Sequence, residues 1–128
     1  MGFMDFLKKK EAPLPPLNQP KISVYRVSEI SVEDAYEQVQ RGVMLLDVRE
    51  GFEWRAHGHV KGAKSLPIGE LSLKRLPSNL DTPLMFMCES GSRSGSAARQ
   101  AVAWGYRNVM NVTGGLMRWK RAGLPVAS

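Results

Sequence analysis

The chain has 128 residues, a formal net charge of +6 and 43% hydrophobic residues, which together predict a single soluble globular domain. Its one cysteine, Cys88, excludes an internal disulfide, so the chain needs no oxidising compartment and we expect a cytoplasmic location. No stretch approaches the ~20 apolar residues of a membrane-spanning helix, so we expect no transmembrane segment.

The positive charge is concentrated in the second half of the chain. Residues 1–60 contain 8 basic and 9 acidic residues, whereas residues 61–128 contain 10 basic and 3 acidic residues. A positive field around a site raises the local concentration of anionic ligands. The basic residues are spread out, with no basic arm, no aromatic-interleaved patch and no metal finger. We therefore expect a small anion as partner rather than nucleic acid.

The first 20 residues are expected to form an N-terminal tail and a proline-rich linker, and the folded domain is placed at residues 21–128. The apolar patch Phe3–Leu7 precedes the basic run Lys8–Lys10, which is the reverse of the order in a signal peptide. A contact of this tail with a membrane surface or a partner remains an alternative to a frayed end. The linker is stiffened by prolines, which fix φ: Pro13, Pro15, Pro16 and Pro20.

The first half of the domain begins with the apolar residues Ile22, Val24 and Val27, which predict a first strand. Ser31 and Asp34 resemble a helix N-cap, and Val32, Ala35, Tyr36 and Val39 would line one face of that helix before Gly42 ends it. The apolar run Val43–Val48 predicts a strand buried on both faces. A polar segment follows over residues 49–64, and residues 69–76 are helix-like.

The second half contains the apolar run Leu84–Met87, which predicts another buried strand. A helix is expected over Ser94–Trp104, a short strand over Asn108–Val112 and a closing helix from Leu116. Strands that alternate with helices predict an α/β domain with a central, mainly parallel sheet flanked by helices. Sites in such sheets lie at the carboxyl ends of the strands, where Cys88 stands.

The segment CESGSR surrounds Cys88 with residues that favour a thiolate. A helix start presents unpaired N–H groups and the positive end of the helix dipole, and both lower the pKa of a cysteine. Gly91, with the small Ser90 and Ser92, allows a tight loop whose N–H groups face inward. Arg93 adds a permanent positive charge. Glu89 would oppose an anion, so its side chain is expected to point outward.

The spacing of this loop separates two chemistries. A cysteine-based phosphatase places five residues between its cysteine and its arginine, whereas only four lie between Cys88 and Arg93. The smaller ring suits a smaller guest, such as one sulfur atom attached to Cys88.

Five ordered motifs resemble those of a single-domain rhodanese over about residues 22 to 126. They are LLDVRE with the following Glu53–Trp54, GHVKGA, Leu66–Pro67, CESGSRS, and the ending formed by Gly114, Gly115, Trp119, Gly123 and Pro125. The resemblance implies a rhodanese-like fold and a sulfurtransferase that carries sulfur as a persulfide on Cys88, with neither metal nor organic cofactor. A small anionic donor such as thiosulfate would supply the sulfur, and cyanide, a thiol or an acceptor protein would remove it.

By the same resemblance, the persulfide is held by the loop residues Glu89, Ser90, Gly91, Ser92, Arg93 and Ser94. Arg93 would either bind substrate or shape the loop. Asp47, Arg49 and His59 would be structural residues near the site, and Glu53 would form ion pairs there. His57 and His59, with one distant cysteine, make a poor metal-ligand set.

Two other functions remain open. A persulfide carrier, or a regulatory interaction module, would show little thiosulfate turnover; the unusual Glu89 and the tail motivate this reading. A small phosphatase or an arsenate-type reductase is disfavoured by the loop spacing and by the absence of a second cysteine.

Overall fold

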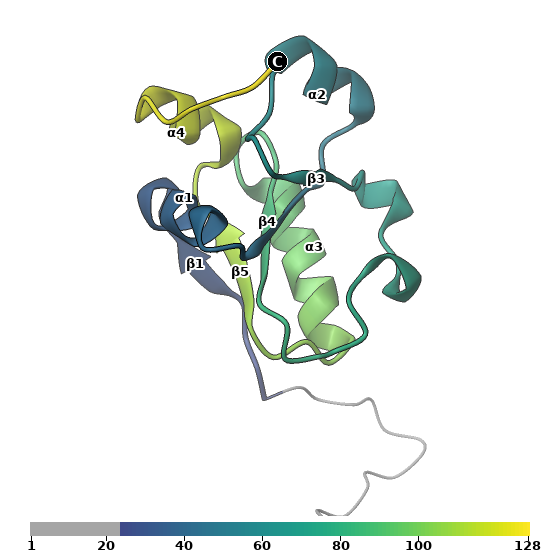
Figure 1. The fold of residues 1–128 in the computed structure, drawn as a ribbon. Helices are drawn as coiled ribbons and strands as arrows, with labels where there is room; N and C mark the ends of the chain where they lie inside the picture. The colour runs from purple at the N-terminus through teal and green to yellow at the C-terminus, as the bar shows by residue number, and fades with distance from the viewer. Residues whose placement is uncertain (1–23) are drawn as a thin grey trace, which may run out of the picture.

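The computed structural model describes residues 24–128; the predicted tail and linker lie outside these residues, as does Ile22 of the expected first strand. The described part forms a sheet of five strands in the order β1-β5-β4-β2-β3, with every neighbouring pair parallel (Figure 1). The prediction of a parallel α/β fold is therefore confirmed. The strands are β1 (Ser28–Ile30), β2 (Met44–Asp47), β3 (Lys64–Ser65), β4 (Leu84–Met87) and β5 (Val109–Val112).

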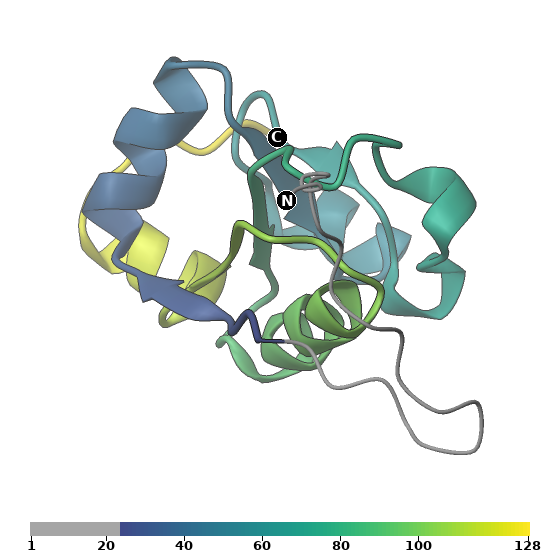
Figure 2. The same ribbon diagram turned by 90° about the horizontal axis from the view of Figure 1, so that it is seen from below.

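Helices cover both faces of the sheet. Helices α1 (Val32–Gln40) and α4 (Gly115–Arg121) lie on one face, and α3 (Ser92–Ala103) lies on the other (Figure 2). Alternate side chains of the central strand β4 enter the two cores: Leu84 and Phe86 pack on the α3 side, and Met85 and Met87 pack on the α1 and α4 side. Because helices cover both faces of the sheet at this strand, all of its side chains are buried and apolar.

Helix α1 has the expected start and end. The Ser31 side chain accepts a hydrogen bond of 3.1 Å from the backbone N–H of Asp34, as an N-cap does. The helix is complete at Gln40, and Gly42 follows with a φ of +91°. Helix α3 begins two residues before its predicted start, because the left-handed Gly91 already turns the chain into the helix.

The structure differs from the predictions at three places: the first strand, the segment after Pro67, and a short edge strand. The first strand begins at Ser28 rather than among the apolar residues before it, and Val24 is 82% exposed. Glu29 of this strand lies in register with Asn111 of β5. The helix-like stretch from Gly69 to Leu76 forms two 3-10 turns, η1 (Ile68–Glu70) and η2 (Leu73–Arg75). The two-residue strand β3 was not predicted.

The polar segment after β2 contains a helix that the sequence analysis missed, α2 (Gly51–His57), which lies beyond the carboxyl ends of the strands and beside the C-terminus (Figure 1). A capping box between Glu50 and Glu53 begins it. None of its residues is buried, so it has no apolar face for a periodicity search to find. No helix within the described residues is long and apolar enough to cross a membrane.

Helix α4 holds the loop that follows β4. Its first turn donates backbone hydrogen bonds to two loop carbonyls, from Leu116 N–H to Cys88 at 2.9 Å and from Met117 N–H to Glu89 at 3.0 Å. The approach requires glycine at position 115, which has a φ of +58° and whose Cβ, if present, would lie 2.6 Å from the Glu89 carbonyl oxygen. The contact fixes the orientation of the peptide groups beside Cys88.

We expect Gly115→Ala to destabilise the domain more than Gly123→Ala. Both positions have positive φ, so both variants carry a left-handed strain of roughly 1–2 kcal/mol. A methyl group at position 123 meets no atom within 4 Å, whereas at position 115 it collides with loop backbone. The free energy of unfolding, measured with urea, should fall by about 2 kcal/mol more for Gly115→Ala. Equal losses for the two variants would show that the close approach is unimportant.

Candidate active site

Cys88 lies between the end of β4 and the start of α3, and it is 1% exposed. Its Sγ atom accepts hydrogen bonds from the backbone N–H groups of Gly91 at 3.1 Å and Ser94 at 3.4 Å. The first turn of α3 has no side-chain oxygen as a cap, so the cysteine sulfur accepts a bond that an N-cap oxygen would otherwise take. The sulfur is therefore built into the start of a helix.

These contacts change the acidity of Cys88. Burial by itself raises the pKa of the thiol, because a thiolate is poorly solvated there. Hydrogen bonds from the Ser94 hydroxyl and from the backbone N–H groups of Ser94, Gly91 and Ser90 outweigh burial, so the pKa of Cys88 lies below its ordinary value. The site favours a buried nucleophilic thiolate.

The Arg93 side chain turns away from its own loop. Its guanidinium donates to both oxygens of Glu53 in α2, at 2.7 and 2.9 Å. This forked ion pair is partly buried, with the two side chains 38% and 15% exposed. The Arg93 hydrogen bonds, followed in size by burial, which opposes them, set the pKa of Glu53 at about 2. Arg93 thus joins the loop to α2 rather than bonding the loop carbonyls.

Arg49 is a second cation behind the loop, and it is fully buried. Its guanidinium donates to both carboxylate oxygens of Asp47 and, at 2.8 Å, to the Gly58 carbonyl. Its Nη1 also lies 3.5 Å from a carboxylate oxygen of Glu89, whose side chain is 33% exposed. Glu89 is thus only partly outward, and the cation beside it is this chain's own Arg49.

Ser94 connects Cys88 to a polar network that the sequence analysis did not identify. Its buried hydroxyl lies 3.4 Å from Cys88 Sγ and 2.6 Å from the Asn111 carboxamide oxygen. The Asn111 Nδ2 group donates to Glu29 and to the Gly91 carbonyl. Asn111 interrupts the apolar strand VMNV, and a polar residue in such a strand was the available signal.

The histidines lie outside the sulfur's hydrogen-bond shell. His59 stacks on Trp54 at a ring-centroid distance of 3.9 Å, and its backbone pairs with that of Ala127. Its Nδ1 is buried and has no hydrogen-bond partner among the described residues. His57 is exposed at the end of α2. Within residues 24–128 no three His, Cys, Asp or Glu side chains are grouped as metal ligands would be.

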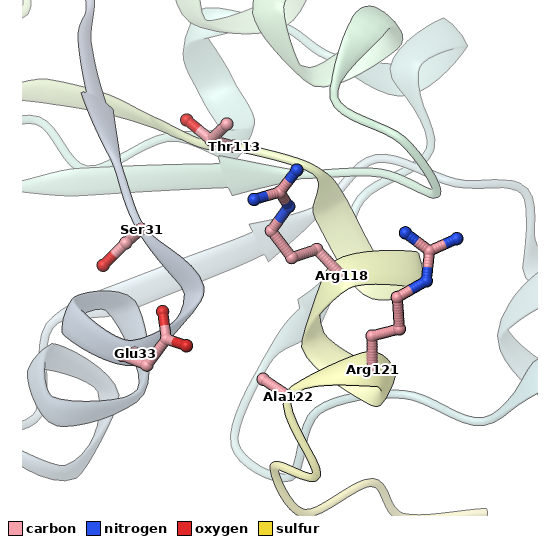
Figure 3. Close-up of a pocket in the computed structure, with 6 residues that line it drawn as sticks. All are labelled: Ser31, Glu33, Thr113, Arg118, Arg121 and Ala122. Atoms are coloured by element: carbon pink, nitrogen blue, oxygen red, sulfur yellow. The ribbon is translucent and has the colours of Figure 1, made fainter.

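The remaining loop hydroxyls, on Ser90 and Ser92, belong to exposed residues at the rim. A cavity of about 530 Å³ lies to one side, between the start of α1 and α4, and contains none of the predicted loop residues. In Figure 3, Arg118 extends toward Thr113 across this cavity. The Thr113 hydroxyl donates to Glu29 at 2.8 Å, so the cavity borders the polar network and not the sulfur.

Known proteins match this chain in sequence and in structure. The family model of the rhodanese-like domain matches residues 31–122. Thiosulfate sulfurtransferase GlpE of Haemophilus influenzae is 34% identical over 98 residues, which cover 77% of this chain and 92% of that protein. An uncharacterised Synechocystis protein is 38% identical over 86 residues, which cover 67% of this chain and only 48% of that longer protein.

A solved structure, the rhodanese-related protein from Thermoplasma volcanium, superposes with a TM-score of 0.69 at 32% identity, covering 78% of this chain and 97% of that one.

We expect the Arg93–Glu53 ion pair to stabilise the domain in a pH-dependent way. Glu53→Gln keeps an acceptor for the capping box but removes the charge, and should cost about 1 kcal/mol at neutral pH, since solvent partly screens Arg93. Folding lowers the pKa of Glu53 from 4.5 to about 2, so the contribution is complete above pH 4.5 and is lost as the pH falls toward 2.

Unfolding of wild type and variant across this pH range tests the expectation. Glu70→Gln is the matched control, because its ion pair with Arg75 is exposed on both sides and should be worth little. A Glu53 effect that is independent of pH would contradict the assignment.

Proposed function

The chain belongs to the rhodanese-like family, and from this premise we propose that it is a sulfurtransferase that carries one sulfur atom as a persulfide on Cys88. The observation that carries the proposal is the pair of backbone N–H groups, from Gly91 and Ser94, directed at the buried Sγ. They stabilise negative charge at the sulfur before and after sulfur transfer, without a neighbouring base.

In the first half-reaction, the Cys88 thiolate attacks the outer sulfur of a donor such as thiosulfate. A bond forms between Sγ and that sulfur, the sulfur–sulfur bond of the donor breaks, and sulfite leaves with the electron pair. The product is a Cys88 persulfide. The N–H groups of Gly91 and Ser94 already contact Sγ, the sulfur to which the transferred atom would be bonded.

In the second half-reaction, a nucleophile such as cyanide or a thiolate attacks the outer sulfur of the persulfide. The bond to Sγ breaks, the acceptor leaves as thiocyanate or as a new persulfide, and the Cys88 thiolate returns. Donor and acceptor react in turn, so ping-pong kinetics follow. The excess of basic residues in the second half of the chain favours approach of an anionic donor.

In this proposal Arg93 shapes the loop, because Glu53 already occupies its forked donors. The buried pair of Asp47 and Arg49 contacts the loop through Glu89, whose partly exposed carboxylate follows Cys88 directly in the chain. A carboxylate so close to the sulfur opposes a doubly charged donor such as thiosulfate. This favours as second candidate a persulfide carrier that receives sulfur from a less charged donor and passes it to a thiol or an acceptor protein.

Replacement of the Cys88 thiol should abolish sulfur transfer. Purified protein is expected to form thiocyanate from thiosulfate and cyanide, and Cys88→Ser should remove this activity, since a hydroxyl does not replace the thiolate nucleophile. Intact-mass measurement after thiosulfate should show one added sulfur atom on the wild type and none on the variant. An adduct without steady turnover would favour the carrier, and undiminished turnover by Cys88→Ser would refute the mechanism.

The charge of Glu89 should select among donors. Glu89→Gln removes one negative charge near the sulfur, and we expect kcat/KM for thiosulfate to rise about threefold, as screened repulsion of under 1 kcal/mol predicts. A singly charged thiosulfonate should gain less. Glu70→Gln, on an exposed 3-10 turn, is the control for total charge. Equal gains for both donors would contradict an electrostatic role of Glu89.

A further inference from the structure

The network behind Cys88 presents a hydroxyl group with two acceptors and one proton. Ser94 Oγ lies 2.6 Å from the Asn111 oxygen but 3.4 Å from Cys88 Sγ. A serine hydroxyl donates one hydrogen bond and accepts others. The two contacts therefore cannot both be donations by Ser94 at the same moment.

The orientation of Asn111 decides where that proton points. Its Nδ2 group faces three acceptor atoms, both carboxylate oxygens of Glu29 at 3.2 and 3.3 Å and the Gly91 carbonyl at 3.3 Å. Its oxygen consequently faces Ser94 and can only accept. Glu29 is fixed in turn by the Thr113 hydroxyl and by its register beside Asn111 in the sheet.

From this arrangement we propose that Asn111 is a positioning residue that sets the charge state of Cys88 by competing for the Ser94 proton. With Cys88 as a thiol, Ser94 donates to Asn111, and its oxygen accepts the S–H hydrogen. When the thiol proton leaves to solvent, the Ser94 hydroxyl can turn from Asn111 to the thiolate. Each turn of the hydroxyl exchanges one hydrogen bond for another and transfers no proton.

The competition restrains thiolate formation. Stabilisation of the thiolate by Ser94 requires loss of the short bond to Asn111, so Asn111 keeps the Cys88 thiolate more basic than it would be if Ser94 donated to it without competition. A more basic thiolate is a stronger nucleophile but a poorer leaving group. On the proposed sulfurtransferase function, Asn111 therefore favours uptake of sulfur by Cys88 over its release.

The test titrates Cys88 directly. Because the chain has one cysteine, thiolate absorbance and the pH profile of iodoacetamide alkylation both report Cys88 alone. Asn111→Leu removes the competing acceptor, excludes water by its similar size, and leaves Gly91 with its bond from Gly95. The Cys88 pKa should fall by about one unit, the size of one hydrogen bond to a charged group.

A double-mutant cycle isolates the route through Ser94. In a Ser94→Ala background, Asn111→Leu should leave the Cys88 pKa unchanged. An equal shift with and without the serine, or no shift in either, overturns the proposal. Both readouts are independent of sulfur transfer, so an inactive protein with the predicted shifts would refute the proposed function and leave this inference standing.

Asn111→Asp supplies a second variant of native shape, and thermal unfolding by circular dichroism shows that each variant is folded. A charged acceptor holds the hydroxyl more strongly, so the Cys88 pKa should rise, opposite to the leucine variant, and this rise should shrink in the Ser94→Ala background. A fall, or a rise that ignores Ser94, would contradict the proposal.

Other charges near the sulfur do not explain such a pattern, because they are the same in Asn111→Leu and the wild type. Glu33, in the first turn of α1, lines the cavity beside Thr113, and Glu33→Gln measures the effect of removing a nearby carboxylate that is outside the hydrogen-bonded network. The charged side chains to be considered are Glu89 on the loop, Arg93 in the first turn of α3, Arg49 after the end of β2, Glu53 in α2, Glu29 on β1, and Arg118 on α4.

Discussion

The site depends on the direction in which the peptide groups of one loop point. Helix α4 binds the carbonyl oxygens of Cys88 and Glu89, so these oxygens face outward from the loop. The N–H groups of Gly91 and Ser94 face the opposite way and reach the sulfur. A peptide group is rigid, so fixing the Cys88 and Glu89 oxygens also fixes the N–H groups of Glu89 and Ser90, and the Ser90 N–H is one of the donors that lower the pKa of Cys88. The arrangement of peptide groups around Cys88 therefore requires two helices, one that supplies N–H groups at its start and one that binds the loop carbonyls.

The charged side chains near Cys88 contribute less to stabilising its thiolate than the number of basic residues in the sequence indicates. The two arginines that contact the loop and its helix start, Arg93 and Arg49, are already paired, Arg93 with Glu53 and Arg49 with Asp47 and Glu89. Burial raises the pKa of Cys88, and the hydrogen bonds that the sulfur accepts from the loop and from Ser94 lower it by more. Fixed dipoles of this kind are weakly screened by salt and need no reorganisation when negative charge develops at the Cys88 sulfur.

The predictable parts of the molecule were those with strong local signals. The apolar runs before Asp47 and Cys88 indicated buried strands, and CESGSR indicated a tight turn into a helix, because burial on both faces and a tight turn constrain composition directly. Helix α2 was missed since none of its residues is buried. The pairing of Glu53 with Arg93 joins positions 40 residues apart, and no short-range pattern encodes it. Asn111 carried a usable signal, a polar residue in a buried strand, but its partners become visible only in the fold.

Helix α2 has a different kind of attachment from the rest of the domain. None of its residues is fully buried, and it is held by the Glu53 ion pair, by the stacking of Trp54 on His59, and by a weak bond from Arg49 to the Glu53 carbonyl. Elements with few buried apolar contacts open at the lowest free-energy cost, well below that of global unfolding. We therefore expect the helix that Arg93 joins to Cys88's loop to open at a lower free-energy cost than the sheet and its two cores.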